Sequence, residues 1–591
     1  SLPAAFDPFA SPTPFRGMAE EAYTVVSDSE ATEEEKPRSK FPEVAIGIDI
    51  GTSQCSVAVW NGSQVELLKD TRNQKIMRSY VTFKEDTPSG GVNSQLAHEA
   101  DLLSGSTVFN IKRLIGRADT DPVIHRSQSL PFLVQTFGIG VRPFIAALVK
   151  NAWRSTTPEE VLAIFLVELK VMAEVRLKRP VRNAVLTVPV SFSRFQLTRV
   201  ERACAMAGLH VLRLMPEPTA VALLYAQQQQ QTVHENMGSG VEKVALIVNA
   251  GAGYCDVAVC ATAGGVSQIR SLRGAAIGGE DLLQNTMQRL VPDFASIIST
   301  RGAGEIMSMG RLRTAAQDAI HKLSFQSSVQ IDVDPGNGSV INTVLSREEF
   351  ERVNAMAFES YQSLILGCLL DSRVDMEDID DVILVGGCSA IPKIKDLVTG
   401  ICRGRSLYEA MNPLEAAVCG AALEGAVASG ITDPFGSLDL LTILATPLSV
   451  GIRTGGNNFE PIIHRNTAIP ARREVGFTTV RDGQAEALVV VYEGEGTMVE
   501  ENHLLGYFKV VGIPAAARGV PEICVCMDID ASNVLRVVVG VTLPGSRNPV
   551  MALMEVRMPT VDDGHGWCAE ALSRACGSEW DLIALPKKVQ Y

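Results

Sequence analysis

Two stretches of this sequence carry residues that could bind a charged ligand, and they are copies of one another. Residues 45–59 read AIGIDIGTSQCSVAV and residues 245–259 read ALIVNAGAGYCDVAV, at an offset of 200 positions without a gap. Each copy has the order strand, small-residue turn, strand, and Gly51 matches Gly251. Turns of Gly with Thr or Ser let backbone N–H groups approach phosphate oxygens without obstruction by a Cβ atom. The repeat predicts two similar lobes that present their turns to one nucleotide polyphosphate.

A carboxylate beside the first turn extends this chemistry to a metal ion. Asp49 ends the first strand, where it can hold Mg²⁺, usually through the waters of the ion. The alternative is that both copies are tight β-hairpins with Gly only for turn geometry. A single hairpin would favour that alternative, whereas two hairpins in matched register favour the phosphate site.

The composition excludes several classes of protein. The chain has 591 residues and a formal charge of −14, which weighs against a nucleic-acid binder because such proteins need a basic face. Hydrophobic residues make up 46% and charged residues 20%, as in globular proteins. No apolar run reaches the roughly 18 residues needed to span a bilayer. The 12 scattered Cys form no CxxC pair, which predicts reduced thiols in a cytoplasmic protein.

The order of apolar runs, helix starts and turns along the chain predicts the elements that position these hairpins. Residues 1–42 are predicted to be a disordered, acidic extension, and 43–430 alternate buried strands with helices, which is an α/β pattern. Helix starts are predicted at Thr157–Glu160 and at Asn412–Glu415, from a cap residue followed by Pro and Glu. Residues 431–445 are a predicted linker, 446–556 an all-β domain, and 557–591 a short tail of unassigned fold.

Several motifs resemble those of the heat-shock 70 kDa (DnaK-type) chaperone family over residues 43–556. They include GIDIGTSQCSV from Gly47, STVFNIKRLIGR ending at Arg117, AGLHVLRLMPEPTA ending at Ala220 and ILVGGCSAIPK ending at Lys393. The sequence is most similar to short plant members that lack the full helical lid. The resemblance implies an actin-like two-lobed ATPase domain, an interdomain linker, an all-β sandwich that binds extended peptides, and a truncated C-terminal lid.

The resemblance also implies site residues, with ATP or ADP and Mg²⁺ as cofactors. The catalytic residues would be Lys112, Asp49, Glu217 and Asp256, of which the three carboxylates would also bind the metal through water. The nucleotide-binding residues would be Gly51, Thr52, Ser53, Gly251, Gly253, Gly278, Gly279, Glu280, Ser324, Gly386 and Gly387. The peptide-binding residues would be Ile452, Thr454, Gly455, Phe477, Val480, Ala487 and Val489.

Departures from the family pattern predict weakened nucleotide binding, slow hydrolysis, or both. Asn249 stands where the family has Asp, and an amide can neither accept a proton nor add charge beside Mg²⁺. Tyr254 places bulk in the second phosphate turn. Other changes lie on the adenine side, at Gln317, Ile320, His321 and Ala390. We expect hydrolysis to be slower than in typical members by on the order of 10²-fold, the scale of one lost acid–base group.

The sequence is compatible with three functional hypotheses. The first is an ATP-binding chaperone for exposed hydrophobic segments of unfolded or nascent polypeptides. Nucleotide-exchange factors and J-domain co-chaperones would be its further partners, although Leu197 replaces the Arg of the J-domain docking helix. The second is a non-hydrolysing, nucleotide-sensing holdase, chaperone regulator or scaffold. The third, an actin-like metabolite kinase, is opposed by the β domain.

Overall fold

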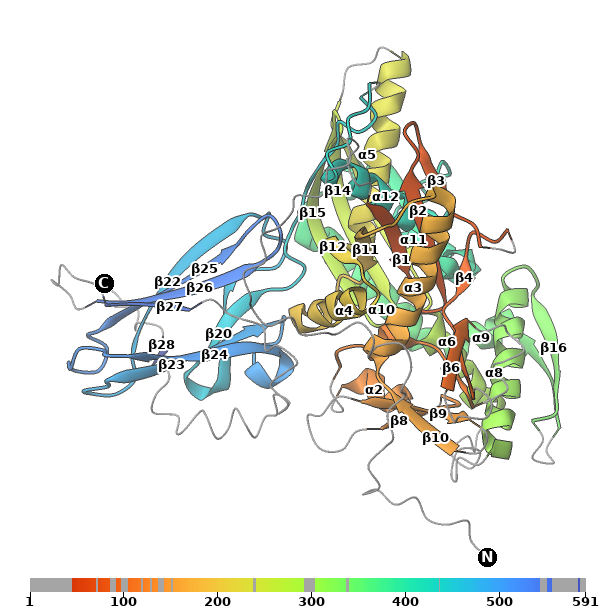
Figure 1. Cartoon of the computed structure of the whole chain (residues 1–591), viewed down its shortest axis with the longest axis horizontal. Coiled ribbons are helices and arrows are strands. Elements are labelled where there is room, and N and C mark those ends of the chain that lie inside the picture. Colours follow the sequence, from red (N-terminus) through yellow and green to blue (C-terminus); the bar gives the residue numbers. More distant parts are fainter. Residues whose placement is uncertain are drawn as a thin grey trace, which may run out of the picture.

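The computed structural model describes most of the chain between Ala45 and Met554, and one short segment beyond it. The described residues are 45–70, 73–85, 92–96, 105–117, 121–127, 130–135, 143–149, 152–236, 241–291, 303–335, 340–434, 436–542, 550–554 and 583–584. The predicted N-terminal extension and nearly all of the C-terminal tail, with the predicted truncated lid, lie outside them. In Figure 1 an all-β part lies to the left of a larger α/β part.

The first hairpin lies in the central sheet of what we call lobe I. This six-stranded sheet has the order β12-β11-β1-β2-β3, with β4 paired to β2. Its strands are β1 (Ile46–Ile50), β2 (Gln54–Trp60), β3 (Val65–Leu67), β4 (Met77–Arg78), β11 (Asn183–Val188) and β12 (His210–Pro216). The first strand of the hairpin, β1, pairs antiparallel with β2 and parallel with β11.

The second hairpin lies in the equivalent position of a second sheet, in what we call lobe II. The order here is β18-β13-β14-β15-β19, and β13 pairs antiparallel with β14 and parallel with β18. The strands are β13 (Lys243–Ala250), β14 (Cys255–Ala263), β15 (Val266–Ala275), β18 (Asp381–Val385) and β19 (Leu441–Ile443). The repeat in the sequence is therefore a repeat in topology.

Small sheets and helices surround the two central sheets. The small sheets contain β5 (Val81–Glu85), β6 (Val92–Leu96) and β7 (Thr107–Val108); β8 (Leu133–Gln135), β9 (Phe144–Val149) and β10 (Ala152–Thr156); and β16 (Ser328–Val333) with β17 (Ile341–Ser346). The helices are α1 (Ile111–Leu114), α2 (Pro122–Arg126), α3 (Pro158–Leu177), α4 (Arg194–Met206), α5 (Glu217–Asn236), α6 (Gly279–Leu290), α8 (Ala303–Leu323), α9 (Arg347–Val353), α10 (Ala355–Ser372), α11 (Pro392–Ile401) and α12 (Ala416–Ala428).

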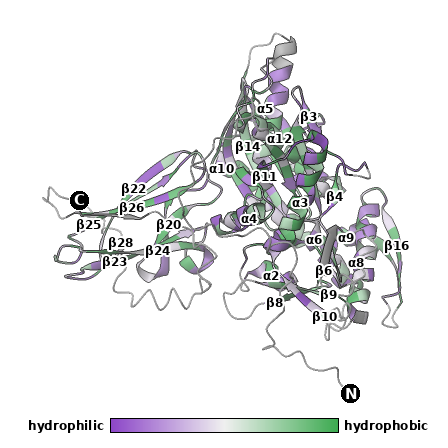
Figure 2. Ribbon diagram, in the orientation of Figure 1, coloured by the Kyte–Doolittle hydropathy of each residue, from purple (hydrophilic) through white to green (hydrophobic). Residues whose placement is uncertain are grey.

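Helices α5 and α12 pack against each other between the lobes. Helix α12 contacts β1 and β2, whereas α5 contacts β13 and β14. A Cβ atom on Gly420 of α12 would lie only 1.8 Å from the carbonyl oxygen of Ala220 on α5, so only glycine permits this approach. Figure 2 shows apolar residues concentrated along these central elements.

The two predicted helix starts have different outcomes. Helix α3 is capped by Thr157, whose side chain accepts a hydrogen bond from the Glu160 N–H. The Glu160 carboxylate in turn accepts a hydrogen bond from the Thr157 N–H. That prediction is confirmed. Asn412 instead forms a turn by accepting from the Leu414 N–H, and α12 begins only at Ala416. The Asn-Pro pattern therefore initiates a turn before the helix, as Asx side chains commonly do.

The all-β part is a sandwich of two antiparallel sheets. One has the order β21-β20-β23-β24 and the other β27-β26-β25-β22-β28. The strands are β20 (Val450–Thr454), β21 (Asn458–Ile463), β22 (Ala471–Thr479), β23 (Glu486–Glu493), β24 (His503–Val511), β25 (Glu522–Ile529), β26 (Leu535–Thr542), β27 (Val550–Met554) and β28 (Ile583–Ala584). The inward residues of both sheets form one apolar core.

Candidate functional site

A cavity between the lobes is bounded by both duplicated turns. Its volume is about 370 Å³, and it is lined by Gly51 and Thr52 from the first turn and by Gly251 and Gly253 from the second. A Cβ atom on Gly253 would lie 2.2 Å from Oγ1 of Thr52, so the two turns approach each other directly. The backbone of each turn is thus available to a polyphosphate in the cleft.

A chain of polar side chains crosses the floor of this cavity. Lys112 from α1 forms a buried ion pair with Glu217, the first residue of α5. The other carboxylate oxygen of Glu217 accepts a hydrogen bond from the amide of Asn249 on β13. Burial alone would lower the pKa of Lys112, but the carboxylates of Glu217 and Asp49 outweigh it and raise that pKa above its usual value. Lys112 is therefore a buried cation held by neighbouring carboxylates.

The two aspartates differ in how they meet the cavity. Asp49 lines it and accepts a hydrogen bond from the Thr187 hydroxyl. Asp256 is fully buried behind the lining residues, where Oδ2 accepts a hydrogen bond from the Val190 N–H at 3.2 Å. Burial, followed by the nearby charge of Glu217, raises the pKa of both aspartates, and that of Asp256 well above its usual value.

One atom in this group fits a bound cation. The second oxygen of Asp256, Oδ1, is buried and has no hydrogen-bond partner, an arrangement that is costly unless an ion or water satisfies it. Among the described residues, no three carboxylate, imidazole or thiolate groups lie close enough to chelate a metal by themselves. Metal binding through water by Asp49, Glu217 and Asp256 stays a prediction.

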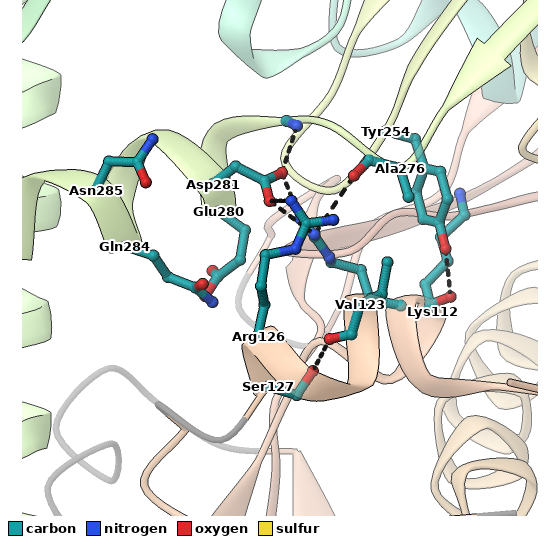
Figure 3. Close-up of polar contacts among 12 residues, drawn as sticks. Lys112, Val123, Arg126, Ser127, Tyr254, Ala276, Glu280, Asp281, Gln284 and Asn285 are labelled. Carbon is teal, nitrogen blue, oxygen red and sulfur yellow. Dashed lines mark hydrogen bonds and ion pairs between the residues drawn. The ribbon is translucent and has the colours of Figure 1, made fainter. Parts of the chain in front are cut away.

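Tyr254 of the second turn packs into lobe I. Its ring is 3% exposed and meets the ring of Phe192 edge to face, with centroids 5.7 Å apart. Its hydroxyl donates to the Lys112 carbonyl at 3.1 Å (Figure 3). The same hydroxyl accepts a hydrogen bond from the Arg117 guanidinium at 3.1 Å. The bulk that was predicted to burden the phosphate turn is thus accommodated by lobe I, where it joins the two lobes beside Lys112.

Ion pairs join the lobes on the same side of the cavity. Asp281 of α6 binds Arg113 of α1 at 2.8 Å and Arg126 of α2 at 3.2 Å (Figure 3). The neighbouring Glu280 lines the cavity, but both of its oxygens are bound by Arg313 of α8. Arg113, Asp281, Glu280 and Arg313 are all buried, which fixes the position of α6 against lobe I.

The remaining predicted nucleotide-binding residues fall into two groups. Gly278 does not line the cavity; a Cβ atom on it would lie 2.5 Å from the Ala252 carbonyl oxygen, so it packs under the second turn. The others line the cavity, namely Ser53, Gly279, Ser324, Gly386 and Gly387. The cavity lining also includes apolar residues and two polar ones, namely Leu283, Ile320, Phe325, Ala390, Ile391 and Leu414 with Gln317 and His321.

The predicted linker, residues 431–445, contains one short strand of the lobe II sheet. Residues of β19 pair in parallel with β15, in the register Val266↔Leu441, Ser267↔Thr442 and Gln268↔Ile443. The strand therefore extends the sheet that carries the second turn. Shortly after it, Ala445 bridges to Ala468 of the sandwich.

Side chains also hold the sandwich against the lobes. The Arg194 N–H donates to buried Glu493 at 2.8 Å, and the Arg194 guanidinium donates to the side-chain oxygen of Asn533 at 2.8 Å. Asp371 of α10 binds Arg465 at 2.9 Å. Sequence reasoning missed these contacts, because isolated charged residues give no pattern that identifies a partner far along the chain.

Five of the predicted peptide-binding residues lie on β20, β22 and β23, which belong to both sheets of the sandwich, and the other two directly follow β20 and β22. Ile452, Phe477, Ala487 and Val489 are fully buried in the sandwich core. Thr454 is also buried, whereas Gly455 is exposed and Val480 is half-buried. Their burial fits ordinary sandwich core, so binding of a peptide by these residues stays a prediction.

Comparison with known proteins identifies the family. The family model for the Hsp70 protein matches residues 45–551. The chain belongs to the Hsp70 family. It is 66% identical over 97% of its length to the whole of "Heat shock 70 kDa protein 8" from Arabidopsis thaliana. It is 34% identical to a "Ribosome-associated molecular chaperone" from Eremothecium gossypii, over 83% of this chain and 79% of that protein.

Hsp70 proteins are chaperones that bind ATP or ADP with Mg²⁺, unfolded polypeptides and co-chaperones. The prediction of the family and of its cofactors is confirmed. Among the described residues, no helix is both long and apolar enough to cross a bilayer. Leu197, which replaces the Arg expected on the docking helix, packs half-buried against the core of lobe I.

Proposed function

We propose that this Hsp70 protein is an ATP-binding chaperone for exposed hydrophobic segments, in which hydrolysis is slow. The observation that carries the proposal is the contact of Asn249 with Glu217 in a cleft that otherwise retains Lys112 and both turns. The Asn249 amide donates a hydrogen bond to one oxygen of the Glu217 carboxylate. Unlike an aspartate at the same position, this amide cannot accept a proton. Relative to the family pattern, the cleft thus keeps the groups that would bind the nucleotide and lacks one acid–base group.

The residues of the cleft have separable roles in this proposal. Bound Mg²⁺ would neutralise charge on the phosphates. Lys112 would stabilise the charge that develops on the transferred phosphoryl group, which in this class of reaction is the main catalytic contribution of the protein. Asp49, Glu217 and Asp256 would hold the waters of the metal, and the glycine turns would position the phosphates.

The linker supports coupling between the nucleotide and the peptide. Strand β19 belongs to the sheet of the second turn, and the sandwich follows it directly. A ligand that favours this docked arrangement over an undocked one shifts the population, and peptide binding shifts the same equilibrium in return. Exposed hydrophobic peptides should therefore change the rate of ATP turnover.

Calorimetric titration with ATP and ADP in the presence of Mg²⁺ tests the first part of this proposal. We expect saturable binding of both nucleotides, followed by slow turnover that an apolar peptide stimulates. Replacement of Lys112 by Ala should abolish measurable turnover, whereas the matched change of exposed Lys322 on α8 should have no effect. A folded protein that binds neither nucleotide would refute the proposal; ATP binding without any turnover would instead favour the nucleotide-sensing holdase or regulator.

A further inference from the structure

A short strand from the C-terminal region of the chain lies at the edge of the sandwich. Strand β28 pairs antiparallel with the end of β22, in the register Thr478↔Ala584 and Thr479↔Ile583. It is the outermost strand of the five-stranded sheet. It also contacts β20 and β23, which belong to the opposite sheet. The strand therefore lies where the two sheets meet.

This position coincides with the predicted peptide-binding residues. Strands β20, β22 and β23 carry five of these residues, and Gly455 and Val480 directly follow β20 and β22. The paired residues Thr478 and Thr479 stand between Phe477 and Val480, two of the seven. Strand β28 therefore pairs directly beside two of the predicted peptide-binding residues.

The sequence of β28 has the character of an unfolded client segment. Ile583 and Ala584 belong to the apolar run Leu582–Leu585, which is preceded by Asp581 and followed by Pro586. An edge strand such as β22 presents unpaired backbone groups to which an extended segment can add as a further strand. Proline lacks the N–H group that would continue such pairing, so Pro586 limits the addition to a short segment.

We propose that strand β28 is an internal ligand that occupies the peptide site, so that client peptides must displace it. This inference deepens the proposed chaperone function and rests on it. A tethered segment competes at an effective concentration that is commonly in the millimolar range, which lowers the apparent affinity for every external peptide. Strong clients would displace the segment, and weak ones would be rejected.

Two matched variants of the full chain test the proposal. Ile583→Asp places a charge in β28, whereas Val589→Asp makes the same kind of change in the C-terminal region outside the strand. Fluorescence polarisation would measure the Kd of a labelled apolar heptapeptide for each protein. If the strand occupies the site roughly nine-tenths of the time, we expect Ile583→Asp to bind the peptide about tenfold more tightly than the unmodified chain does. Val589→Asp should leave the Kd unchanged.

Backbone hydrogen exchange gives a second readout that does not depend on client binding. Amides at the end of β22, around Thr478 and Thr479, should exchange faster in Ile583→Asp and not in Val589→Asp. Equal exchange in all three proteins would overturn the proposal. So would faster exchange combined with unchanged peptide affinity, because the strand would then pair without competing. A third outcome is that Ile583→Asp exchanges faster while none of the three proteins binds the peptide. That result would support the pairing of β28 with β22, but it would refute both the competition and the proposed client binding.

Discussion

The two duplicated hairpins share a backbone and differ in the position of their single carboxylate. In the first, Asp49 on β1 lies opposite Ser56 on β2; in the second, Asn249 on β13 lies opposite Asp256 on β14. The carboxylate has therefore changed strand while the register is the same. Backbone geometry and turn glycines are constrained by the approach of the lobes, whereas the flanking side chains are free to diverge in chemistry.

The consequence of this difference is an asymmetric cleft. Asp49 faces the cavity, whereas Asp256 is buried behind it, and the cavity position of the second hairpin is held by an amide. A second aspartate at position 249 would lie against Glu217, so two carboxylates would require a cation between them. The present side chain makes that contact as a hydrogen bond.

The largest loss of ATP affinity is expected from a substitution where the two hairpins touch. Gly253→Ala would place a Cβ atom 2.2 Å from Oγ1 of Thr52, so one turn must move. We expect affinity for ATP, measured by calorimetry, to fall on the order of 10²-fold, which corresponds to about 2.7 kcal/mol. Addition of Thr52→Ala removes the two closest atoms and should restore part of the affinity. A folded Gly253→Ala protein with unchanged affinity would show that the turns do not meet in solution.

A second difference between the hairpins should appear as pH-dependent stability. Burial raises the pKa of Asp256 well above its usual value, so the folded protein binds this proton more readily than the unfolded chain does. The stability of the nucleotide-free protein is consequently reduced as the pH rises above the ordinary pKa of Asp. Asp256→Asn removes this cost, and we expect stabilisation of roughly 1–3 kcal/mol at pH 8 that shrinks near pH 4.

Thermal unfolding without nucleotide measures this effect. The melting temperature of Asp256→Asn should exceed that of the unmodified protein at pH 8, whereas exposed Asp378→Asn should change it little. A lower melting temperature for Asp256→Asn at pH 8 would indicate that the charged carboxylate stabilises the fold.

The smallest effect concerns the residue that joins the second hairpin to lobe I. Tyr254→Phe keeps the ring against Phe192 but removes the hydrogen bonds to Lys112 and Arg117. We expect the turnover number to fall several-fold, in line with about 1 kcal/mol for a lost hydrogen bond, with little change in KM. Tyr408→Phe removes a hydroxyl outside the cleft and should leave turnover unchanged. Equal effects of the two variants would contradict the positioning role of Tyr254.

The sequence predicted the parts of the site that depend on local pattern. Glycine turns between alternating apolar strands, and the cap at Thr157, impose their geometry on the residues around them. The interlobe contacts of Tyr254 and the interdomain contacts of Arg194 depend on which surfaces meet after folding. No local sequence pattern therefore predicts them. The depth of Asp256 was also missed, because a strand residue beside a turn can face either the cavity or the core.

Single-turnover cleavage of ATP by Asn249→Asp tests the central claim most directly. With saturating Mg²⁺, we predict a rate about 10²-fold higher than that of the unmodified chain, because the variant regains a proton acceptor beside Glu217. The exposed Asn342→Asp variant should cleave at the unmodified rate. An Asn249→Asp rate equal to that of the unmodified protein, with nucleotide affinity intact, would contradict the account.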